Sequence, residues 1–317
     1  MKYVGLHTQQ VRNNLRSMLL LLMFPCLVVL LTFLFSVLYT RFTFGLPVWE
    51  QAMWMFTSTL PVVLVGVGIW FLIAYFANTA IIRSATGART LQRRENMRVY
   101  NLVENLCMSQ GMRMPKVNVI EDESLNAYAS GINDSTYTVA LSRGIINRLD
   151  DAELEGVIAH ELAHIRNRDV RLLIVSIVFV GIFSMISQIA FRSLIHAPRG
   201  RSNNNKGGAG IIVMILVALA IAVIGYFVAI LLRFAISRKR EYLADAAAAE
   251  MTKHPQALAN ALRKISRNPN IASLTRDDVA QLFIEHPKPK NSFFSGISGL
   301  FATHPPIEKR IAILEQI

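Results

Sequence analysis

The sequence predicts a mostly α-helical membrane protein with four transmembrane helices and an α+β domain on the cytoplasmic side. The chain has 317 residues, 53% of them hydrophobic, and a mean hydropathy of +0.38, which is too apolar for an ordinary soluble domain. Four stretches carry no charged residue, and each is at least as long as the roughly 20 residues that a helix needs to cross a bilayer. They are 17–40, 51–82, 172–191 and 207–232.

These stretches divide the chain into alternating membrane and soluble parts. Residues 1–82 form a two-span membrane region, and 170–232 form a second pair of spans with a Gly- and Asn-rich, flexible linker at 196–210. The soluble domain is built from 83–169 and 233–317. We expect the first span to be an uncleaved anchor, because it is too long for a signal peptide and no small-residue cleavage site follows it.

The net charge of +12 is explained by the membrane and does not require a nucleic-acid partner. Lysines and arginines gather beside the ends of the spans: Arg83, Arg89, Arg93, Arg94, Arg166, Arg168, Arg171, Arg233, Arg238, Lys239 and Arg240. The positive-inside rule then places both termini and 83–171 in the cytoplasm. Three cations in the linker (Arg199, Arg201 and Lys206) oppose this orientation but are outnumbered.

Patterning within the soluble parts indicates mixed α and β structure. Apolar residues at helical spacing predict a helix that begins after Arg93 and ends near Gly111. Alternating or β-branched segments predict strands in 116–122, 126–131 and 135–142. Asp150 and Glu153 form a capping box for the next helix, whose buried side carries Leu154, Val157, Ile158 and Leu162. Two amphipathic helices follow in 255–267 and 307–317.

The sequence HELAH at 160–164 lies on the helix that begins at the capping box. Residues i and i+4 share a helix face, so His160 and His164 can direct two imidazoles at one zinc ion. Glu161 lies about 100° around the helix from His160, where its carboxylate can act on a water without taking a ligand position. This HExxH pattern is typical of zinc peptidases with the glutamate as general base, although the bare motif also occurs by chance on helix surfaces.

A third protein ligand is required, and Glu241 is the candidate. A histidine six residues after His164 is excluded, since that position is Val170. Glu241 and Asp245 are one turn apart, and Ala244 and Ala246 are small enough for close helix contact. We expect Asp245 to accept a hydrogen bond from the His160 imidazole. Two membrane crossings separate His164 from Glu241, so both lie on the same side of the membrane.

The segments "VIAHELAHIRNRD", "SRKREYLADAAAA", "NAYASG" and "THPPIEKRI" together resemble HtpX-type membrane zinc metalloproteases, relatives of the CAAX prenyl-protein endoproteases. The resemblance implies a zincin-like (gluzincin) catalytic domain with one Zn²⁺ per chain, held by His160, His164 and Glu241, and Glu161 as catalytic base. It also implies an endopeptidase in the bacterial inner membrane that degrades misfolded or damaged membrane proteins at the cytoplasmic surface. Tyr128 departs from the family's usual phenylalanine.

Three further residues are candidates for contacts with the substrate or transition state. Asn126 and Tyr128 are predicted to lie on a cleft-edge strand that pairs with an extended peptide, or alternatively on a strand buried in the sheet. His304 either stabilises the oxyanion or anchors the last helix. A prenyl-protein-type endoprotease and a zinc-binding membrane scaffold without peptidase activity are the alternative functions. A transporter is disfavoured because the four spans contain no ionisable Asp, Glu, His, Lys or Arg.

Overall fold

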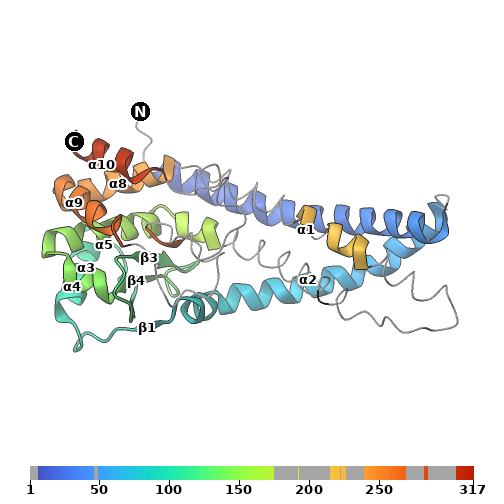
Figure 1. Cartoon of the computed structure of the whole chain (residues 1–317), viewed down its shortest axis with the longest axis horizontal. Coiled ribbons are helices and arrows are strands. Elements are labelled where there is room, and N and C mark those ends of the chain that lie inside the picture. The colour runs from blue at the N-terminus through green and yellow to red at the C-terminus, as the bar shows by residue number, and fades with distance from the viewer. Residues whose placement is uncertain are drawn as a thin grey trace. The chain divides into compact units, whose positions relative to one another are not determined.

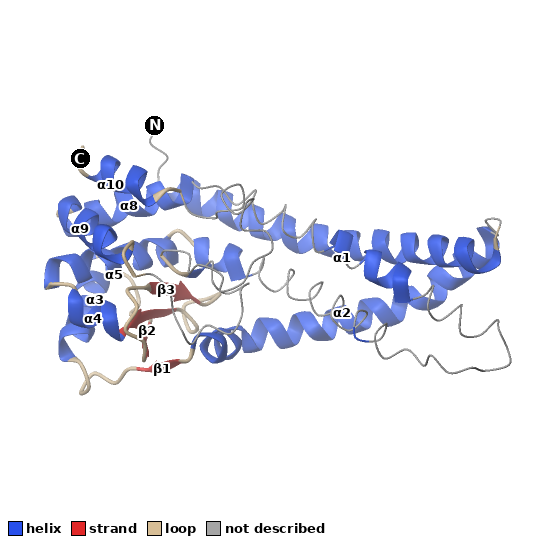
Figure 2. Cartoon of the chain, in the orientation of Figure 1, coloured by secondary structure: helices blue, strands red, loops and turns tan. Residues whose placement is uncertain are grey.

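The computed structural model describes residues 6–45, 49–174, 192, 215–221, 223–225, 239–268, 282–284 and 305–317. The chain divides into two compact units. One, here called the apolar unit, consists of residues 18–76 and 175–235. The other, the sheet-containing unit, consists of residues 1–17, 77–174 and 236–317. Helices dominate the described residues, and the strands form one small sheet (Figure 2).

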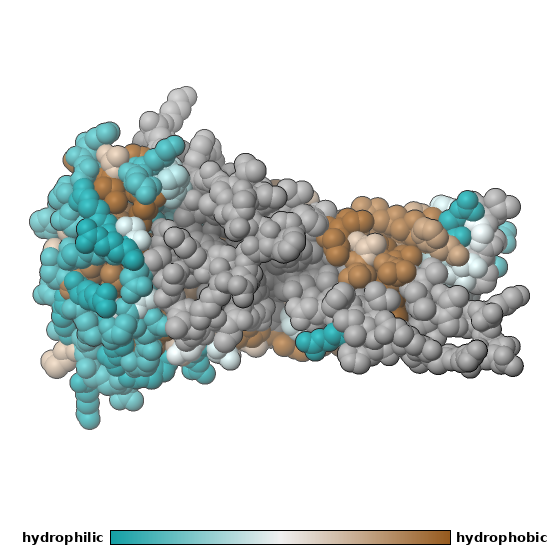
Figure 3. All heavy atoms as spheres, in the orientation of Figure 1, coloured by the Kyte–Doolittle hydropathy of each residue, from teal (hydrophilic) through white to brown (hydrophobic). Residues whose placement is uncertain are grey.

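Two long helices, α1 (Leu6–Phe44) and α2 (Trp49–Thr86), supply most of the described part of the apolar unit. Each contains a segment that is long and apolar enough to cross a membrane: Leu22–Thr43 in α1 and Trp49–Ile73 in α2. Large apolar side chains such as Val62 and Trp54 are exposed on α2. Brown, apolar atoms gather on the visible surface over α1, whereas teal, hydrophilic atoms with some brown ones among them lie in the region of α8 to α10 (Figure 3). The surface over α1 is the more uniformly apolar of the two. A surface of this kind suits contact with lipid rather than water.

The core of the apolar unit joins α1 to a short apolar helix at Ile215–Gly225. Phe24, Val28 and Leu31 recur at the spacing of one helix face and pack with Val217 and Ile221. Of the four predicted spans, the first two are therefore found as candidate membrane helices, and the fourth is helical where it is described. Most of the third span and the whole 196–210 linker lie outside the described residues.

The sheet-containing unit has a four-stranded sheet with the order β1-β2-β4-β3. Its strands are β1 (Ala88–Thr90), β2 (Lys116–Ile120), β3 (Ala127–Ser130) and β4 (Thr138–Ser142). β2 and β4 are parallel, and the other two neighbouring pairs are antiparallel. The three predicted strands are confirmed. β1 was not predicted, because three residues are too few to show an alternating pattern.

Helix α5 (Asp151–Arg166) occupies the centre of this unit, between β3 and β4 on one side and α8 (Lys239–Thr252) and α9 (Pro255–Ile265) on the other (Figure 1). α3 (Met97–Ser109) also packs on α5, α4 (Arg143–Arg148) follows β4, and α10 (Ile307–Leu314) contacts α8 and α9. The helices predicted for the soluble parts of the chain are confirmed, and α4 is a further helix that the sequence patterns did not predict.

The sequence explains why α5 begins and packs where it does. The side chain of Asp150 accepts a hydrogen bond from the backbone N–H of Glu153, and the Glu153 side chain accepts one from the backbone N–H of Asp150, which confirms the capping box. The four predicted apolar residues are fully buried: Leu154, Val157, Ile158 and Leu162. A Cβ at Gly156 would lie 3.2 Å from Leu258 of α9, so glycine permits the close approach of these helices. The cap and this packing hold α5 in place, and α5 carries His160 and His164.

Candidate metal centre

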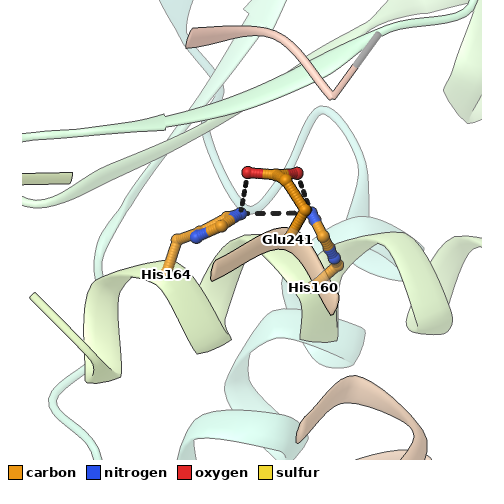
Figure 4. Close-up of side chains that lie close together, drawn as sticks. All are labelled: His160, His164 and Glu241. Atoms are coloured by element: carbon orange, nitrogen blue, oxygen red, sulfur yellow. Dashed lines mark hydrogen bonds and ion pairs between the residues drawn. The ribbon is translucent and has the colours of Figure 1, made fainter. Parts of the chain in front are cut away.

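His160 and His164 project from α5 toward Glu241 of α8, and the three side chains converge on one point (Figure 4). Nε2 of His160 lies 3.2 Å from Nε2 of His164. Glu241 places Oε2 at 3.7 Å from Nε2 of His160 and Oε1 at 3.6 Å from Nε2 of His164. Three potential ligand atoms thus lie within 4.8 Å of one another. The structure brings together the three residues that the sequence suggested as ligands.

These spacings fit a zinc ion. A tetrahedral zinc ion with bonds of about 2.0–2.1 Å holds its ligand atoms about 3.4 Å apart. The 3.2 Å between the two Nε2 atoms, and the 3.6 and 3.7 Å from each Nε2 to its nearer Glu241 oxygen, lie close to that value, although a different carboxylate oxygen is nearest each histidine. Two imidazoles and one carboxylate are also a donor set that zinc favours, and a fourth position is left for a water or substrate oxygen. His160 and Glu241 are buried, whereas 14% of the His164 side chain is exposed.

Small residues on α8 permit its close contact with α5, but only one of the two predicted alanines is among them. Ala244 and Ala248 are fully buried, whereas Ala246 is exposed. The prediction that Ala246 permits the close contact is therefore wrong. Residues 241, 244, 245 and 248 recur every three or four positions and share one helix face, from which 246 points away. Ala248 takes the place that sequence reasoning gave to Ala246.

Asp245 and Asp169 each lie against one of the two histidines. Nδ1 of His160 is 2.9 Å from Oδ1 of Asp245, and Nδ1 of His164 is 3.1 Å from Oδ2 of Asp169. Carboxylates at this position select the tautomer that presents Nε2 to a metal. Sequence reasoning suggested Asp245 but not Asp169, which follows the second histidine in "HIRNRD". The signal was present as a carboxylate five residues after His164, although no helical spacing singled it out.

The electrostatics of the site favour a positive charge among these acidic groups. Burial lowers the pKa of His160, but hydrogen bonds to Asp245 and Glu241 outweigh it and raise this pKa to about 9. Burial raises the pKa of Asp245, but the charge and hydrogen bonds of Arg310 outweigh that effect and lower it to about 2. The carboxylates of this cluster are thus arranged to hold cationic partners, which is what a metal-binding site requires.

Glu161 lies on α5 and is 2% exposed. It follows the first histidine directly, so it shares the rigid buried turn that presents the candidate ligands. His304 lies outside the described residues, and its role stays a prediction.

The edge of β3 is not free at Tyr128. Phe283 pairs with Tyr128 in an antiparallel bridge, and the backbone N–H of Ile284 donates to the carbonyl of Ala127 at 2.9 Å. Asn126 and Tyr128 are buried, and the ring of Phe283 packs edge-on against Tyr128 with centroids 5.1 Å apart. The buried-strand alternative therefore describes these residues better than an open cleft edge. A peptide that pairs with β3 here must first displace 282–284.

Tyr128, the departure from the family pattern, has a local explanation. Its hydroxyl and that of Thr86 at the end of α2 lie 3.0 Å apart and share a hydrogen bond. Burial raises the pKa of this phenol to about 12, so the hydroxyl keeps its proton. The tyrosine thus adds a polar contact that a phenylalanine lacks.

A comparison with family models decides the classification. The model of Peptidase family M48 matches residues 93–317, which include the whole HELAH helix and the Glu241 helix. The chain belongs to peptidase family M48. The resemblance to HtpX-type metalloproteases that the motifs indicated is thereby confirmed.

This M48 peptidase is similar to curated proteins named as HtpX homologues. It is 64% identical to a "Protease HtpX homolog" of Bacteroides fragilis, with 100% of both chains covered. It is 38% identical to a "Protease HtpX homolog" of Dictyoglomus turgidum, with 80% of this chain and 82% of the relative covered. Among solved structures, Ste24p of S. mikatae aligns with a TM-score of 0.44 and 19% identity, covering 96% of this chain and 66% of that one.

Proposed function

We propose that this M48 peptidase is a zinc endopeptidase of the bacterial inner membrane that cleaves misfolded or damaged membrane proteins at the cytoplasmic surface. The observation that carries the catalytic part is the spacing of Nε2 of His160, Nε2 of His164 and the Glu241 carboxylate, which matches a tetrahedral zinc site. Two candidate membrane helices support the membrane location. The quality-control role is supported by the likeness to HtpX homologues.

In this proposal His160, His164 and Glu241 hold the zinc ion, and Asp245 orients His160. Zinc in such a site acts as a Lewis acid and lowers the pKa of a water to about 7. Glu161 acts as general base: its carboxylate takes a proton from the attacking water and passes it to the amine of the departing peptide. Since Glu161 serves no ligand role, loss of its carboxylate affects proton transfer and leaves the metal in place.

The experiment compares four variants of the full chain purified in detergent. Glu161→Gln is expected to keep one zinc per chain while cleavage of unfolded casein falls by at least about 10²–10⁴-fold. His160→Ala, His164→Ala and Glu241→Ala are expected to lose zinc and cleavage together. Wild-type cleavage by Glu161→Gln would exclude Glu161 as the base. A wild-type protein that binds zinc but cleaves nothing would favour the scaffold alternative.

The cytoplasmic orientation rests on a different observation, the cations at the span ends. Reporter fusions test the orientation separately, so a wrong orientation would not contradict the proposed zinc site or the role of Glu161.

A further inference from the structure

Arg310 lies in the last helix, α10, yet its side chain is completely buried beside the candidate metal centre. Arginine is almost never fully buried unless its charge is paired. Here Nε donates to Oδ2 of Asp245 at 2.8 Å, and Nη2 donates to Oδ1 of the same carboxylate at 2.7 Å. Two parallel charge-assisted hydrogen bonds of this kind fix both the position and the plane of a carboxylate.

The carboxylate that Arg310 holds is the one that contacts a candidate ligand. Oδ1 of Asp245 lies 2.7 Å from Nη2 of Arg310 and 2.9 Å from Nδ1 of His160. A continuous chain of contacts therefore runs from α10 through α8 to α5. It ends at the imidazole whose other nitrogen, Nε2, faces His164 and Glu241.

The guanidinium is itself held from other directions. Nη1 donates to the backbone carbonyl of Ile284 at 3.2 Å and lies 3.8 Å from Oε2 of Glu241. Nη2 also lies against the His160 ring itself, 3.5 Å from Nδ1 and 3.4 Å from Nε2. Arg310 thus lies between both carboxylates of α8 that belong to the site. With so many contacts, the side chain has little freedom to rotate, and the orientation of Asp245 follows from it.

We propose that Arg310 is a positioning residue for the metal centre, which fixes the ring of His160 mainly by holding Asp245 and also by its own contact with the ring. The inference rests on the zinc site of the proposed function and adds to it a third element, α10, that completes a site whose ligands come from α5 and α8. A guanidinium offers no lone pair to a metal, so Arg310 is not a candidate ligand. Its role is to keep Nε2 of His160 aimed at the point that His164 and Glu241 also face.

Packing of α10 is a separate function, and the structure assigns it to other residues. Leu314 and Ile307 are buried on the same helix and supply its apolar contacts. A helix that needed only to be anchored could use such residues and would not need a buried charge, whose desolvation is costly. Leu314→Ala therefore serves as the matched control: it weakens the packing of α10 and leaves the Arg310–Asp245–His160 contacts in place.

The test measures zinc binding by the full chain in detergent, using competition with a chelator, and records the absorption spectrum of the cobalt(II)-substituted protein. Arg310→Met is expected to weaken zinc binding by about 10–100-fold, the usual effect of losing an outer-shell partner. Arg310→Lys is expected to fall in between, because lysine keeps the charge but lacks the planar fork. Leu314→Ala is expected to lower the melting temperature, with zinc affinity and the cobalt spectrum unchanged.

A double-mutant cycle with Asp245→Asn tests the path. If Arg310 acts mainly through Asp245, the effects are less than additive: Arg310→Met weakens zinc binding much less in the Asp245→Asn protein than in the wild type. The double variant also removes both buried charges, so it covers the case in which Arg310→Met alone does not fold.

Wild-type zinc affinity in Arg310→Met, strictly additive effects in the cycle, or an equal loss of zinc in Leu314→Ala would overturn the inference. In those outcomes the proposed function stands, because the wild type still binds zinc. A wild-type protein that binds no zinc would overturn both.

Discussion

Asp169 lies against His164 as Asp245 lies against His160: the Nδ1–carboxylate distances are 3.1 Å and 2.9 Å. Each candidate ligand histidine therefore has its own carboxylate on Nδ1, while the two Nε2 atoms approach each other at 3.2 Å. Asp169 is held in turn by Arg240 of α8, whose Nη1 lies 3.7 Å from Oδ1 of Asp169 and donates to its backbone carbonyl. The two helices that carry the ligands are thus also joined through this second carboxylate.

Asp169→Asn is expected to weaken zinc binding by about 10-fold or more, because an amide is a poorer acceptor for the Nδ1–H of His164. Chelator competition with the purified protein measures the change. Asp151→Asn is the control, since Asp151 is an exposed carboxylate on the same helix that pairs only with the Arg98 side chain among the described ion pairs. If both variants bind zinc equally well, Asp169 does not orient His164.

Zinc uptake is expected to depend on pH through His160. Hydrogen bonds to Asp245 and Glu241 raise the pKa of His160 to about 9 despite its burial, so the metal-free protein holds a proton there at pH 7. Zinc requires the neutral imidazole and displaces this proton, so zinc affinity should rise about tenfold per pH unit between pH 7 and the His160 pKa. Calorimetric titrations in two buffers with different ionisation enthalpies count the protons released. A zinc affinity that stays flat over this range would contradict the expectation.

The stability of the metal-free fold should change in the opposite direction. The pKa of His160 in the folded state is above its ordinary value of about 6.5, so the folded state binds the proton more tightly than the unfolded state. The stabilisation is fully present below about pH 6.5 and is lost as pH rises toward the folded-state pKa. Urea unfolding of chelator-treated protein at several pH values measures this loss, and His160→Gln, which has no titrating imidazole, is the control.

Phe283→Ala is expected to lower the KM for unfolded casein if substrates pair with β3. The segment 282–284 occupies the edge of β3 at Tyr128, so a peptide must displace it. Removing the buried Phe283 ring weakens this competing contact, at a cost to stability of about 3–5 kcal/mol. Leu314→Ala, a buried truncation remote from β3 in sequence, is the control for destabilisation alone. An unchanged or higher KM in Phe283→Ala would indicate that substrates bind elsewhere.

Reporter fusions test the proposed orientation in the membrane. Fusions after Asp169 and after Ser237 are expected to give the same cytoplasmic signal, because His164 and Glu241 come together in one site and two predicted spans lie between them. Positive charges at the span ends give the side. Opposite signals from the two fusions would exclude the four-span arrangement, and two periplasmic signals would reverse the orientation.

The sequence by itself determined the local features of this protein. The capping box at Asp150, the buried face of α5 and the i, i+4 placement of His160 and His164 all follow from helix geometry over one or a few turns. The pair Glu241 and Asp245 could be predicted for the same reason, because a zinc site needs a third protein ligand and these two residues are one helical turn apart. Spacing within a helix fixes which side chains share a face, so such features need no knowledge of the rest of the chain.

Only the tertiary structure decided which distant segments complete the site. Arg310 is 65 residues from Asp245 and 150 from His160, and 282–284 joins β3 through backbone hydrogen bonds that any sequence can make. The prediction for Ala246 was wrong because α8 has small residues on several faces, and the sequence alone does not show which face contacts α5. Contacts between separate elements depend on how those elements pack, and packing depends on the whole unit rather than on the spacing within any one segment.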